Sequence, residues 1–435
     1  MMRKRKRFRS TCLLVGLLSC LGIGYMIYQT YFAKQVIRIG VYSGSSWDVP
    51  SGQDNNLLDE TIARFEKEHP NVEVVYESGI SKNDYSDWLS DQMVMGEQPD
   101  VFMVPENDFN LLASTGALAN LDPFVSRDLD KSIYYSASYE AGTYDSLQYA
   151  LPFENNPVLL CINQDLLDKE GIALPDGTWS LEEFYKVCQQ LSKDTDGDGQ
   201  LDQFATVGYS WQEAVAAEGL SLFNEKGTKA QLNTSDMRQA LSWYSKLEDL
   251  NGSYKVTSSD FDKGKVAFMP MTLAEYRTYK SYPYHVSKYA TFSWTCIAMP
   301  TKSGQVENSQ MGTSLLAISS KSRKSELAWA FLKLLSANQE TQQSLFEQSQ
   351  GASVLTSVMT SQKTAELLQS DQFGDNALNQ SKLNQILAQA EPSLKFKQYT
   401  SLMEEADYLI TRSIKEDSLE TDLASIQRKL EDAMD

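Results

Sequence analysis

Histidine is almost absent from this chain, which holds only His69 and His285 among its 435 residues. The two stand far apart and match neither an HExxH motif nor a zinc-ligand spacing, so the sequence argues against a histidine-centred metal site and a Ser/His/Asp triad. No GxxxxGK(S/T) sequence occurs either. We therefore expect no ATP hydrolysis by this chain.

Positive charge is also in short supply. The chain has 39 lysine and arginine residues against 58 aspartate and glutamate residues, a formal net charge of -19. Apart from its N-terminus, such a chain is repelled by phosphate backbones and anionic membrane surfaces, so we expect no nucleic-acid partner. Hydrophobic residues make up 42% and charged residues 22%. This composition is that of a folded protein, and the length indicates two or more large units.

Cysteine is scarce, with five residues in all. Cys12 and Cys20 belong to the N-terminal segment, while Cys161, Cys188 and Cys296 form neither a CxxC motif nor an even set. We therefore predict no disulfide framework and expect these three side chains to be small buried apolar groups.

The one long apolar run lies at the N-terminus. Six cations occupy residues 3–9, and the 24 residues from Ser10 to Ala33 carry no charge. A helix needs about 20 residues to cross the hydrocarbon core, so residues 1–34 are predicted to be an export signal that stays as a membrane anchor, with residues 35–435 outside. Leu17-Leu18-Ser19-Cys20 also resembles the lipobox of bacterial lipoproteins, in which Cys20 would be acylated. The sequence after Cys20 remains apolar where a lipoprotein usually has a polar spacer, so the uncleaved anchor is favoured.

Strand and helix patterns alternate in the first third of the chain. Residues 36–42, 72–76 and 101–104 are predicted strands, and residues 57–69, 85–95 and 108–114 are predicted helices. This alternation predicts a parallel sheet covered by helices, with a ligand outside the carboxyl ends of the strands, near residues 43–48, 77–79 and 105–108. A second mixed region runs from residue 159 to about 300, without a Pro- or Ser-rich linker before it. Short crossovers that act as hinges are therefore expected between the two regions.

Eight segments occur in an order and spacing that resemble one known family. They are FEKEHPNVEVVYES (65–78), QPDVFMV (98–104), TGALANLDPF (115–124), LPFENNPVLLCINQDLLDKEGI (151–172), TWSLEEF (178–184), FDKGKVAFM (261–269), IAMPTKSG (297–304) and SLLAISSKSRKSELAWAFLKLL (314–335). The chain resembles the extracellular solute-binding proteins of carbohydrate ABC importers, in the maltose-binding-like group of family 1. One departure is Cys161, where the family usually has tyrosine before the retained Asn163.

The resemblance implies an α/β fold of the two-lobed, periplasmic-binding-protein type II, in which each lobe is a mixed, mostly parallel sheet flanked by helices and the ligand lies in the cleft between lobes. Lobe 1 is expected to comprise residues 35–154 and 305–350, and lobe 2 residues 155–304 and 351–435. It also implies a monomeric, non-enzymatic receptor that captures a sugar or oligosaccharide and delivers it to ABC transporter permease subunits. The membrane would be its other partner, through the N-terminus.

A sugar ring offers an apolar face to an aromatic side chain and hydroxyl groups to carboxylates and amides. Trp47 follows the first strand, where it could stack on a ligand or pack in its loop, and Asp108 could contact the ligand or cap a helix. Glu154 and its two neighbours are polar between apolar strands and need partners. Tyr209 and Trp211 lie where family members commonly place a stacking aromatic. The full set of expected ligand contacts is Ser46, Trp47, Asp48, Glu77, Asn107, Asp108, Glu154, Asn155, Asn156, Tyr209, Trp211, Met271, Glu275, Tyr276 and Gly312. In contrast, Trp179, Trp243, Trp294 and Trp329 are expected in the core, with ligand contact as the alternative for Trp294.

The segment DTDGDGQLD (194–202) has the spacing of an EF-hand calcium loop. The predicted ligands of a structural Ca2+ ion are Asp194, Asp196, Asp198, the carbonyl group of Gln200, and Asp202. Position 12 of the loop is Ala205, where an EF-hand has a bidentate glutamate. A solvated acidic turn is the alternative.

Three other functions remain open at this point. The same fold could serve as a ligand sensor for a membrane partner, or bind a polyamine or an oxyanion in place of a sugar. A surface glycoside hydrolase using Asp108 and Glu154 is the enzymatic alternative, although no hydrolase signature occurs.

Overall fold

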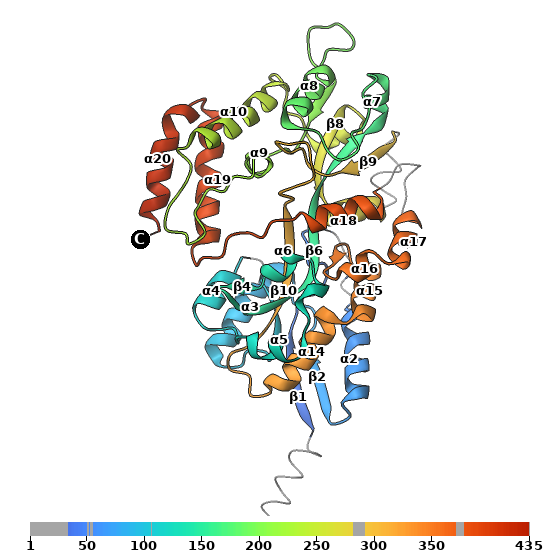
Figure 1. The fold of residues 1–435 in the computed structure, drawn as a ribbon, viewed down its shortest axis with the longest axis vertical. Helices are drawn as coiled ribbons and strands as arrows, with labels where there is room; N and C mark the ends of the chain where they lie inside the picture. The colour runs from blue at the N-terminus through green and yellow to red at the C-terminus, as the bar shows by residue number, and fades with distance from the viewer. Residues whose placement is uncertain are drawn as a thin grey trace, which may run out of the picture.

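The computed structural model describes residues 34–49, 52, 55–105, 107–281, 292–370 and 378–434. The predicted export segment, with Cys20, lies outside the described residues. Figure 1 shows two lobes, one above the other, which are joined near the middle of the molecule. The two-lobed α/β fold expected from the sequence is confirmed.

Lobe 1 is built on the parallel strands that the alternating pattern predicts. Strand β1 (Gln35–Gly40) lies between β2 (Val72–Tyr76) and β3 (Val101–Val104) and is parallel to both. Strand β10 (Met311–Ile318) then adds to β3 in the antiparallel sense. The helices of this lobe are α2 (Asn56–Glu68), α3 (Lys82–Met95), α4 (Phe109–Ser114), α5 (Asp122–Asp128), η1 (Lys131–Ile133), α6 (Ser136–Glu140), α14 (Ser325–Ala337) and α15 (Gln339–Gln348). A small hairpin of β4 (Thr143–Tyr144) and β5 (Leu147–Gln148) completes the lobe.

The core of lobe 1 lies between this sheet and its helices. Ile37 and Phe102 are fully buried on the strands. Phe65 of α2 meets Phe331 of α14 edge to face, with ring centroids 5.1 Å apart. These contacts bury the apolar faces of α2 and α14 against the sheet, which is the main stabilising term for such helices.

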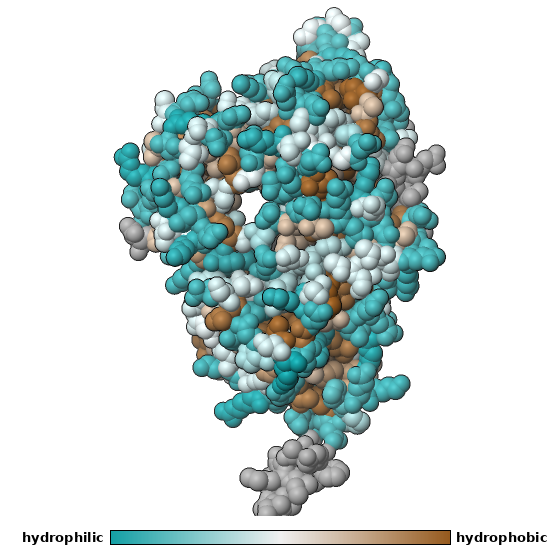
Figure 2. Space-filling view, viewed as in Figure 1, coloured by the Kyte–Doolittle hydropathy of each residue, from teal (hydrophilic) through white to brown (hydrophobic). Residues whose placement is uncertain are grey.

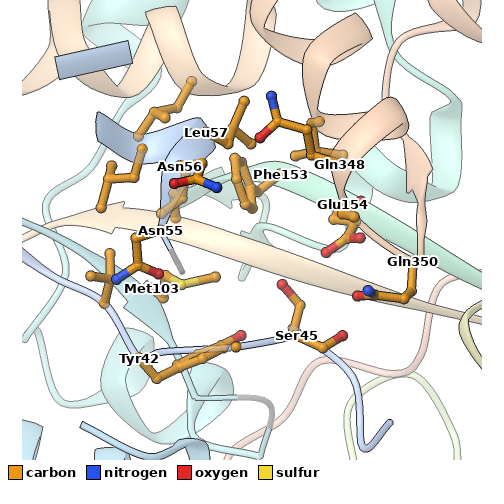
Figure 3. Close-up of a pocket in the computed structure, with 18 of the residues that line it drawn as sticks. Tyr42, Ser45, Asn55, Asn56, Leu57, Met103, Phe153, Glu154, Gln348 and Gln350 are labelled. Carbon is orange, nitrogen blue, oxygen red and sulfur yellow. The ribbon is translucent and has the colours of Figure 1, made fainter. Parts of the chain in front are cut away.

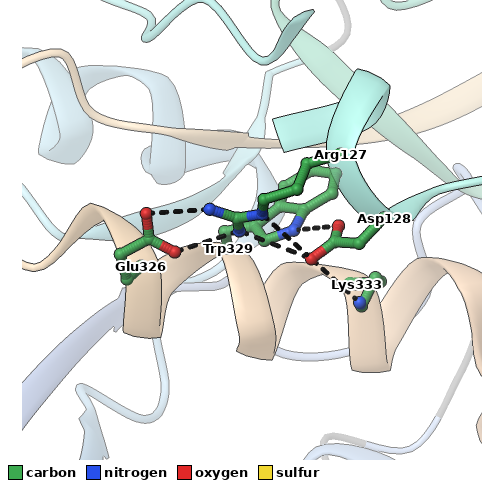
Figure 4. Close-up of polar contacts among 5 residues, drawn as sticks. All are labelled: Arg127, Asp128, Glu326, Trp329 and Lys333. Atoms are coloured by element: carbon green, nitrogen blue, oxygen red, sulfur yellow. Dashed lines mark hydrogen bonds and ion pairs between the residues drawn. The ribbon is translucent and has the colours of Figure 1, made fainter. Parts of the chain in front are cut away.

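A polar cluster joins α5 to α14 at the surface of lobe 1 (Figure 4). The Arg127 guanidinium donates to both carboxylate oxygens of Glu326, at 3.0 Å each. Trp329 Nε1 donates to Asp128 at 2.8 Å, and Lys333 lies 3.5 Å from the same carboxylate. Trp329 is 1% exposed, so its position in the core is as predicted.

Strand β6 (Ala150–Asn163) runs from one lobe into the other. Its first half pairs with β10 and with β11 (Ala352–Ser353), and its second half pairs with β8 (Val266–Thr272) and β9 (Trp294–Ile297), all antiparallel. The register between β10 and β6 shifts between Ser314 and Leu315. One sheet path, β2-β1-β3-β10-β6-β8-β7, therefore crosses both lobes, and the crossovers are short, as expected from the lack of a linker.

Lobe 2 has two groups of helices. The first group surrounds β8, β9 and β7 (Phe204–Thr206), and consists of α7 (Gln164–Lys169), α8 (Leu181–Leu191), α11 (Ser258–Asp262) and α12 (Leu273–Ser281). The second group packs around its own apolar cluster and consists of α9 (Trp211–Ala217), α10 (Ser235–Asp249), α19 (Tyr399–Lys415) and α20 (Leu419–Asp432). Helices α16 (Thr356–Met359), α17 (Gln362–Ser370) and α18 (Gln380–Ala388) lie along the junction between the lobes (Figure 1).

Helix α8 in lobe 2 begins with a reciprocal cap. At α8, Ser180 Oγ accepts from the Glu183 N–H, and the Glu183 carboxylate accepts from the Ser180 N–H. This reciprocal capping satisfies two backbone donors at the first turn. Within the described part of the chain, no helix is long and apolar enough to span a membrane.

Candidate functional site

The two lobes share a pocket of about 190 Å3, which we call the cleft pocket. Its walls come from the start of α4 and from α6 in lobe 1, from β10 in the crossover, and from the segment between α18 and α19. The lining residues are Asn107, Phe109, Asn110, Ala137, Ala141, Met311, Gly312, Thr313, Leu315, Glu391, Pro392, Ser393, Lys395, Tyr399 and Thr400. Figure 2 shows an opening on this face, between the helical group of α9, α10, α19 and α20 and the rest of the molecule.

The segment between α18 and α19 contacts lobe 1 directly at this pocket. Thr400 Oγ1 donates to the carbonyl oxygen of Asn107 at 3.2 Å. The Lys395 ammonium lies 5.2 Å from the ring centroid of Phe109, within the range of a cation–π contact. Burial lowers the pKa of Lys395 to about 8, so this side chain is largely protonated at neutral pH.

Besides Asn155 Nδ2, on a residue bonded to Thr313 of the pocket wall, two buried polar atoms near the cleft pocket have no hydrogen-bond partner among the described residues. Asn110 Oδ1 is one of them, on a residue that is 7% exposed. The other is Trp47 Nε1, whose ring lies over Gly312, so that a Cβ at position 312 would stand 3.1 Å from the indole Cζ3 atom. Buried polar groups are nearly always paired, so both atoms are candidates for contact with a ligand.

Local contacts hold the loop that carries Trp47. The Ser43 N–H donates to the Ile80 carbonyl oxygen at 2.8 Å, and Ser43 Oγ accepts from the Gly79 N–H at 3.0 Å. Lys82 pairs with Asp48 at 3.0 Å. The loop after β1 is therefore fastened to the loop after β2, as expected for two parallel neighbours whose carboxyl ends meet at one edge.

A larger pocket, of about 490 Å3, lies within lobe 1 and is lined in part by residues 44–46 of this loop (Figure 3). Aromatic faces and amide groups both line it, and Ser46 is the predicted ligand contact that it includes beside Glu154. The lining residues are Val41, Tyr42, Gly44, Ser45, Ser46, Gly52, Asn55, Asn56, Leu57, Leu58, Glu60, Met103, Phe153, Glu154, Leu316, Leu335, Leu345, Gln348, Ser349 and Gln350. In contrast to the cleft pocket, no group from lobe 2 takes part.

The side-chain oxygens of the three polar residues of the crossover accept hydrogen bonds within the protein, whereas Asn155 Nδ2 is buried without a partner among the described residues. Their expected role as ligand contacts stays a prediction. Glu154 Oε1 accepts from the Gly351 N–H at 2.8 Å. Asn155 Oδ1 accepts from the hydroxyl groups of Ser138 and Thr313, at 3.0 and 3.1 Å. Asn156 Oδ1 accepts from the Ala274 N–H at the start of α12, at 2.9 Å. The expectation that they need partners was right, but these protein groups join the crossover to both lobes.

The negative charge of Glu154 lies close to a buried cation. Arg277, on α12, is 8% exposed and donates to the carbonyl oxygens of Gly351 and Phe346 at 2.9 and 2.8 Å. Burial lowers the pKa of Arg277 to about 10, and the charge of Glu154 acts in the opposite direction. Through its bond to Gly351, Arg277 joins α12 to the turn that precedes β11.

The aromatic side chains predicted to stack on the ligand in lobe 2 are packed in its core instead. Tyr209 is 3% exposed, and its ring lies 5.8 Å from that of Trp243. Trp211 is 2% exposed, and its Nε1 donates to Asp407 on α19 at 2.9 Å. Both rings fill the space between α-helices, because the loop after β7 turns them inward.

The other predicted contacts of lobe 2 are also structural. Met271 and Tyr276 belong to the buried cluster around β8, and Tyr276 packs against Trp294 with centroids 5.3 Å apart. The Glu275 carboxylate accepts from the backbone N–H and the hydroxyl group of Thr272. These two hydrogen bonds from Thr272 to Glu275 cap the first turn of α12. The core positions predicted for Trp179, Trp243 and Trp294 agree with their packing in buried clusters.

The remaining predicted contacts of lobe 1 differ in their surroundings. Glu77 accepts from Trp88 Nε1 at 3.2 Å, and the Asp48 side chain is 85% exposed beside Lys82. Asp108 precedes α4 but makes no capping bond, and its carboxylate accepts from Ser86 Oγ at 2.6 Å. Of the predicted set, Asn107 and Gly312 line the cleft pocket, and Trp47 lies against Gly312.

Sequence reasoning missed the segment 391–400, which supplies one wall of the cleft pocket. A sequence feature that could have indicated this segment is Pro392. It interrupts an otherwise helical C-terminal region and is followed by Phe396 and Tyr399. Asn110 was also missed, because it follows the predicted loop as part of α4.

Three carboxylates of the acidic loop converge outside the lining of both pockets. Asp194, Asp196 and Asp198 each offer an oxygen within 4.8 Å of the others. The Asp194 carboxylate accepts from the backbone of Gly199 and Gly197, and these bonds lower its pKa. The Asp202 carboxylate is instead bonded to Thr195, through the N–H at 2.8 Å and the hydroxyl group at 2.7 Å. The first three residues thus fit a hard cation, and Asp202 is not part of their cluster.

Comparisons with known proteins agree with the fold. A family model described as bacterial extracellular solute-binding protein matches residues 50–342. An uncharacterised lipoprotein of Streptomyces antibioticus is 31% identical over 31% of this chain and 30% of its own length. The diacetylchitobiose-binding protein of Streptomyces coelicolor is 25% identical over 70% of this chain and 69% of its own length. The solved structure of the sugar-binding protein MalE from Xanthomonas citri covers 92% of this chain and 97% of its own, with a TM-score of 0.76 at 16% identity.

Proposed function

Because the chain belongs to the bacterial extracellular solute-binding protein family, we propose that it captures a sugar or oligosaccharide between its lobes and delivers it to an ABC transporter permease. In this proposal the chain is a monomeric receptor that performs no catalysis. The Streptomyces coelicolor relative, which is named for the sugar diacetylchitobiose, supports a carbohydrate ligand.

The observation that carries the proposal is the chemistry of the cleft pocket. Residues from both lobes line it, so a ligand there would contact both and favour their closure. Asn110 Oδ1 on the pocket wall can accept a hydrogen bond, and Trp47 Nε1, on a ring that lies against Gly312 of that wall, can donate one. Phe109 and Tyr399 add aromatic rings. This combination of ring faces with unpaired polar atoms suits a polyhydroxylated ring.

The charges at the pocket favour a neutral ligand. Lys395 and Glu391 line the same pocket with opposite signs. The two charges oppose each other, so the pocket offers little net attraction to a polyamine or an oxyanion, whereas sugar hydroxyl groups can both donate and accept hydrogen bonds.

A thermal-shift screen of the full chain in detergent against mono- and oligosaccharides, polyamines and oxyanions tests this function. A ligand at 100 times its dissociation constant adds about 2.7 kcal/mol to the free energy of unfolding, which is readily measured as a rise in Tm. We expect a shift with one class of sugar. A shift with a polyamine or an oxyanion and with no sugar would contradict the proposal.

We also propose that the lobes divide as the sequence suggested, at residues 154/155, 304/305 and 350/351.

A further proposal is that the N-terminal segment holds the protein at the outer face of the cell membrane. The uncleaved segment is the favoured anchor, and acylation of Cys20 is the alternative, which the lipoprotein name of the Streptomyces antibioticus relative supports. The mass of the membrane-extracted protein distinguishes a chain that begins at residue 1 from a lipid-modified chain that begins at Cys20.

Calcium in the acidic loop is a separate proposal. Asp194, Asp196 and Asp198 would hold the ion, with the Gln200 carbonyl group as a further ligand, and the ion would stiffen the loop between α8 and β7. At ten times its dissociation constant, Ca2+ would add about 1.4 kcal/mol of stability. We expect a chelator to lower Tm in the wild type and in the control variant Asp176→Asn, but not in Asp196→Asn. Equal chelator effects in both variants would contradict the site.

A further inference from the structure

Two cysteines that are 135 positions apart in the sequence meet on neighbouring strands of lobe 2. Cys161 of β6 is paired directly with Cys296 of β9 in an antiparallel ladder. Both side chains are fully buried, and their Sγ atoms lie 2.7 Å apart.

That separation is too short for two sulfur atoms that merely pack together, since even non-bonded carbon atoms stay about 3.5–4.0 Å apart. The backbone positions also suit a covalent bond. Directly opposite residues in an antiparallel pair have Cα atoms about 4.5–5.5 Å apart, inside the range of about 4.4–6.8 Å that disulfides span. Oxidation would therefore need only a small approach of the sulfur atoms, with no movement of the strands.

We propose that Cys161 and Cys296 form a disulfide bond in the exported protein. The thiolate of one cysteine attacks an external disulfide, which is an oxidised low-molecular-weight thiol or an oxidoreductase, and releases one external thiolate. The second cysteine then displaces the other external thiolate from the mixed disulfide. Overall, the two protein thiols are oxidised, and the external disulfide is reduced to two thiols. Membership of an extracellular family places the chain where such bonds persist.

The surroundings of the pair restrict when the bond can form. Burial raises the pKa of the Cys161 thiol well above its usual range, with a further contribution from Cys296. A buried, protonated thiol reacts slowly, so the thiol–disulfide exchange must take place during folding, before β9 pairs with β6. The finished bond would be protected from reductants for the same reason.

Cys188 provides a matched control within the same lobe. It is also fully buried, on α8, and burial raises its pKa as well. It packs in a different apolar cluster from Cys161 and Cys296. The proposal therefore assigns one disulfide and one free thiol to residues 34–435.

The test is to alkylate the full exported chain in denaturant without reduction, digest it and analyse the peptides by mass spectrometry. We expect a linked pair of peptides that contain Cys161 and Cys296, and complete alkylation of Cys188. Alkylation of Cys161 and Cys296 in the unreduced exported protein would overturn the proposal, as would a link that involves Cys188.

Thermal unfolding gives a second readout. A bond that closes so long a loop should raise Tm by about 5–10 °C relative to protein that was reduced in denaturant and refolded. The Cys188→Ala variant should keep this difference, and the Cys161→Ala/Cys296→Ala variant should lose it. A difference that persists in the double variant would overturn the assignment to this pair.

Discussion

Trp47 combines two features that rarely occur together in a side chain that only fills space. Its ring is 7% exposed and lies against Gly312 on the crossover strand β10, yet its Nε1 has no acceptor among the described residues. An unsatisfied buried N–H costs about 1–3 kcal/mol. A ligand hydroxyl group at the cleft would remove that cost, so the orphaned donor favours binding.

This reasoning predicts the effect of replacing Trp47 by phenylalanine, which keeps an aromatic ring over Gly312 and removes the N–H. We expect sugar affinity to fall about 2- to 10-fold, as for the loss of one net hydrogen bond, measured by calorimetry. Trp88→Phe is the matched control, because Trp88 Nε1 is already bonded to Glu77. Equal sugar affinity of Trp47→Phe and wild type would rule out the contact.

Arg277 shows the opposite situation, a buried charge whose partners are all supplied by the protein. Replacing it by methionine would keep the volume and leave Glu154 as an uncompensated buried charge. We expect a loss of about 3–5 kcal/mol in the free energy of unfolding, measured with urea. The double variant Arg277→Met/Glu154→Gln should recover much of this loss. If the double variant recovers nothing, the stability lost in Arg277→Met comes from its hydrogen bonds to the carbonyl groups of Gly351 and Phe346, and not from the charge of Glu154.

At the scale of elements, the contact between α5 and α14 depends on the charge of Asp128. Burial alone would raise the pKa of this carboxyl group, but the Trp329 N–H and the Lys333 and Arg127 cations outweigh burial and lower it below 3.8. A lowered pKa means that the carboxylate contributes stability above the unfolded pKa and loses it as the pH falls through the folded value.

We therefore expect Asp128→Asn to cost about 1 kcal/mol at pH 7, with the difference from wild type shrinking below pH 4. Urea unfolding at pH 7 and pH 3 measures both values. Glu326→Gln is the comparison, since that side chain is 71% exposed and should change stability by less than about 0.5 kcal/mol. If Asp128→Asn is less stable than the wild type by the same free energy at both pH values, the charge of Asp128 does not account for the difference.

Most elements could be predicted from the sequence because their signals are local. The β-branched strands at residues 36–42, 72–76 and 101–104, and the amphipathic helices between them, each depend on signals that act over a few positions. The cleft could be predicted only in part. That Asn155 needs a partner follows from its apolar neighbours, but that Ser138 and Thr313 supply it depends on long-range packing.

Other parts of the site depend on contacts with no local signature. Thr400 meets Asn107 across 293 positions, and Cys161 meets Cys296 across 135. An aromatic residue just after a strand, such as Tyr209, can point to the cleft or to the core, and its neighbours in the sequence do not decide which. Contacts made by segments far apart in the chain therefore separate the predicted site from the observed one.

At the scale of the whole molecule, the lobes are joined by strands and not by a flexible linker. A compact chain of about 400 residues has a radius of gyration of about 21 Å. We expect the ligand-free protein to exceed this value in small-angle X-ray scattering and to approach it, by on the order of 1 Å, when sugar is added. An unchanged radius with bound sugar would contradict closure of the lobes around the ligand.

The place where β1 begins has a mechanical consequence. Gln35 lies at the end of lobe 1 that is remote from the cleft (Figure 1), and Lys34 is paired with Glu73 of β2 at 2.9 Å. A pull on the proposed anchor would act along the axis of β1, a strand with a parallel partner on each side. A force in this direction loads all the backbone hydrogen bonds between β1 and its two neighbours at the same time, and does not break them one after another. Lobe 1 would then behave as a fixed base, and lobe 2 would be the part that is free to swing.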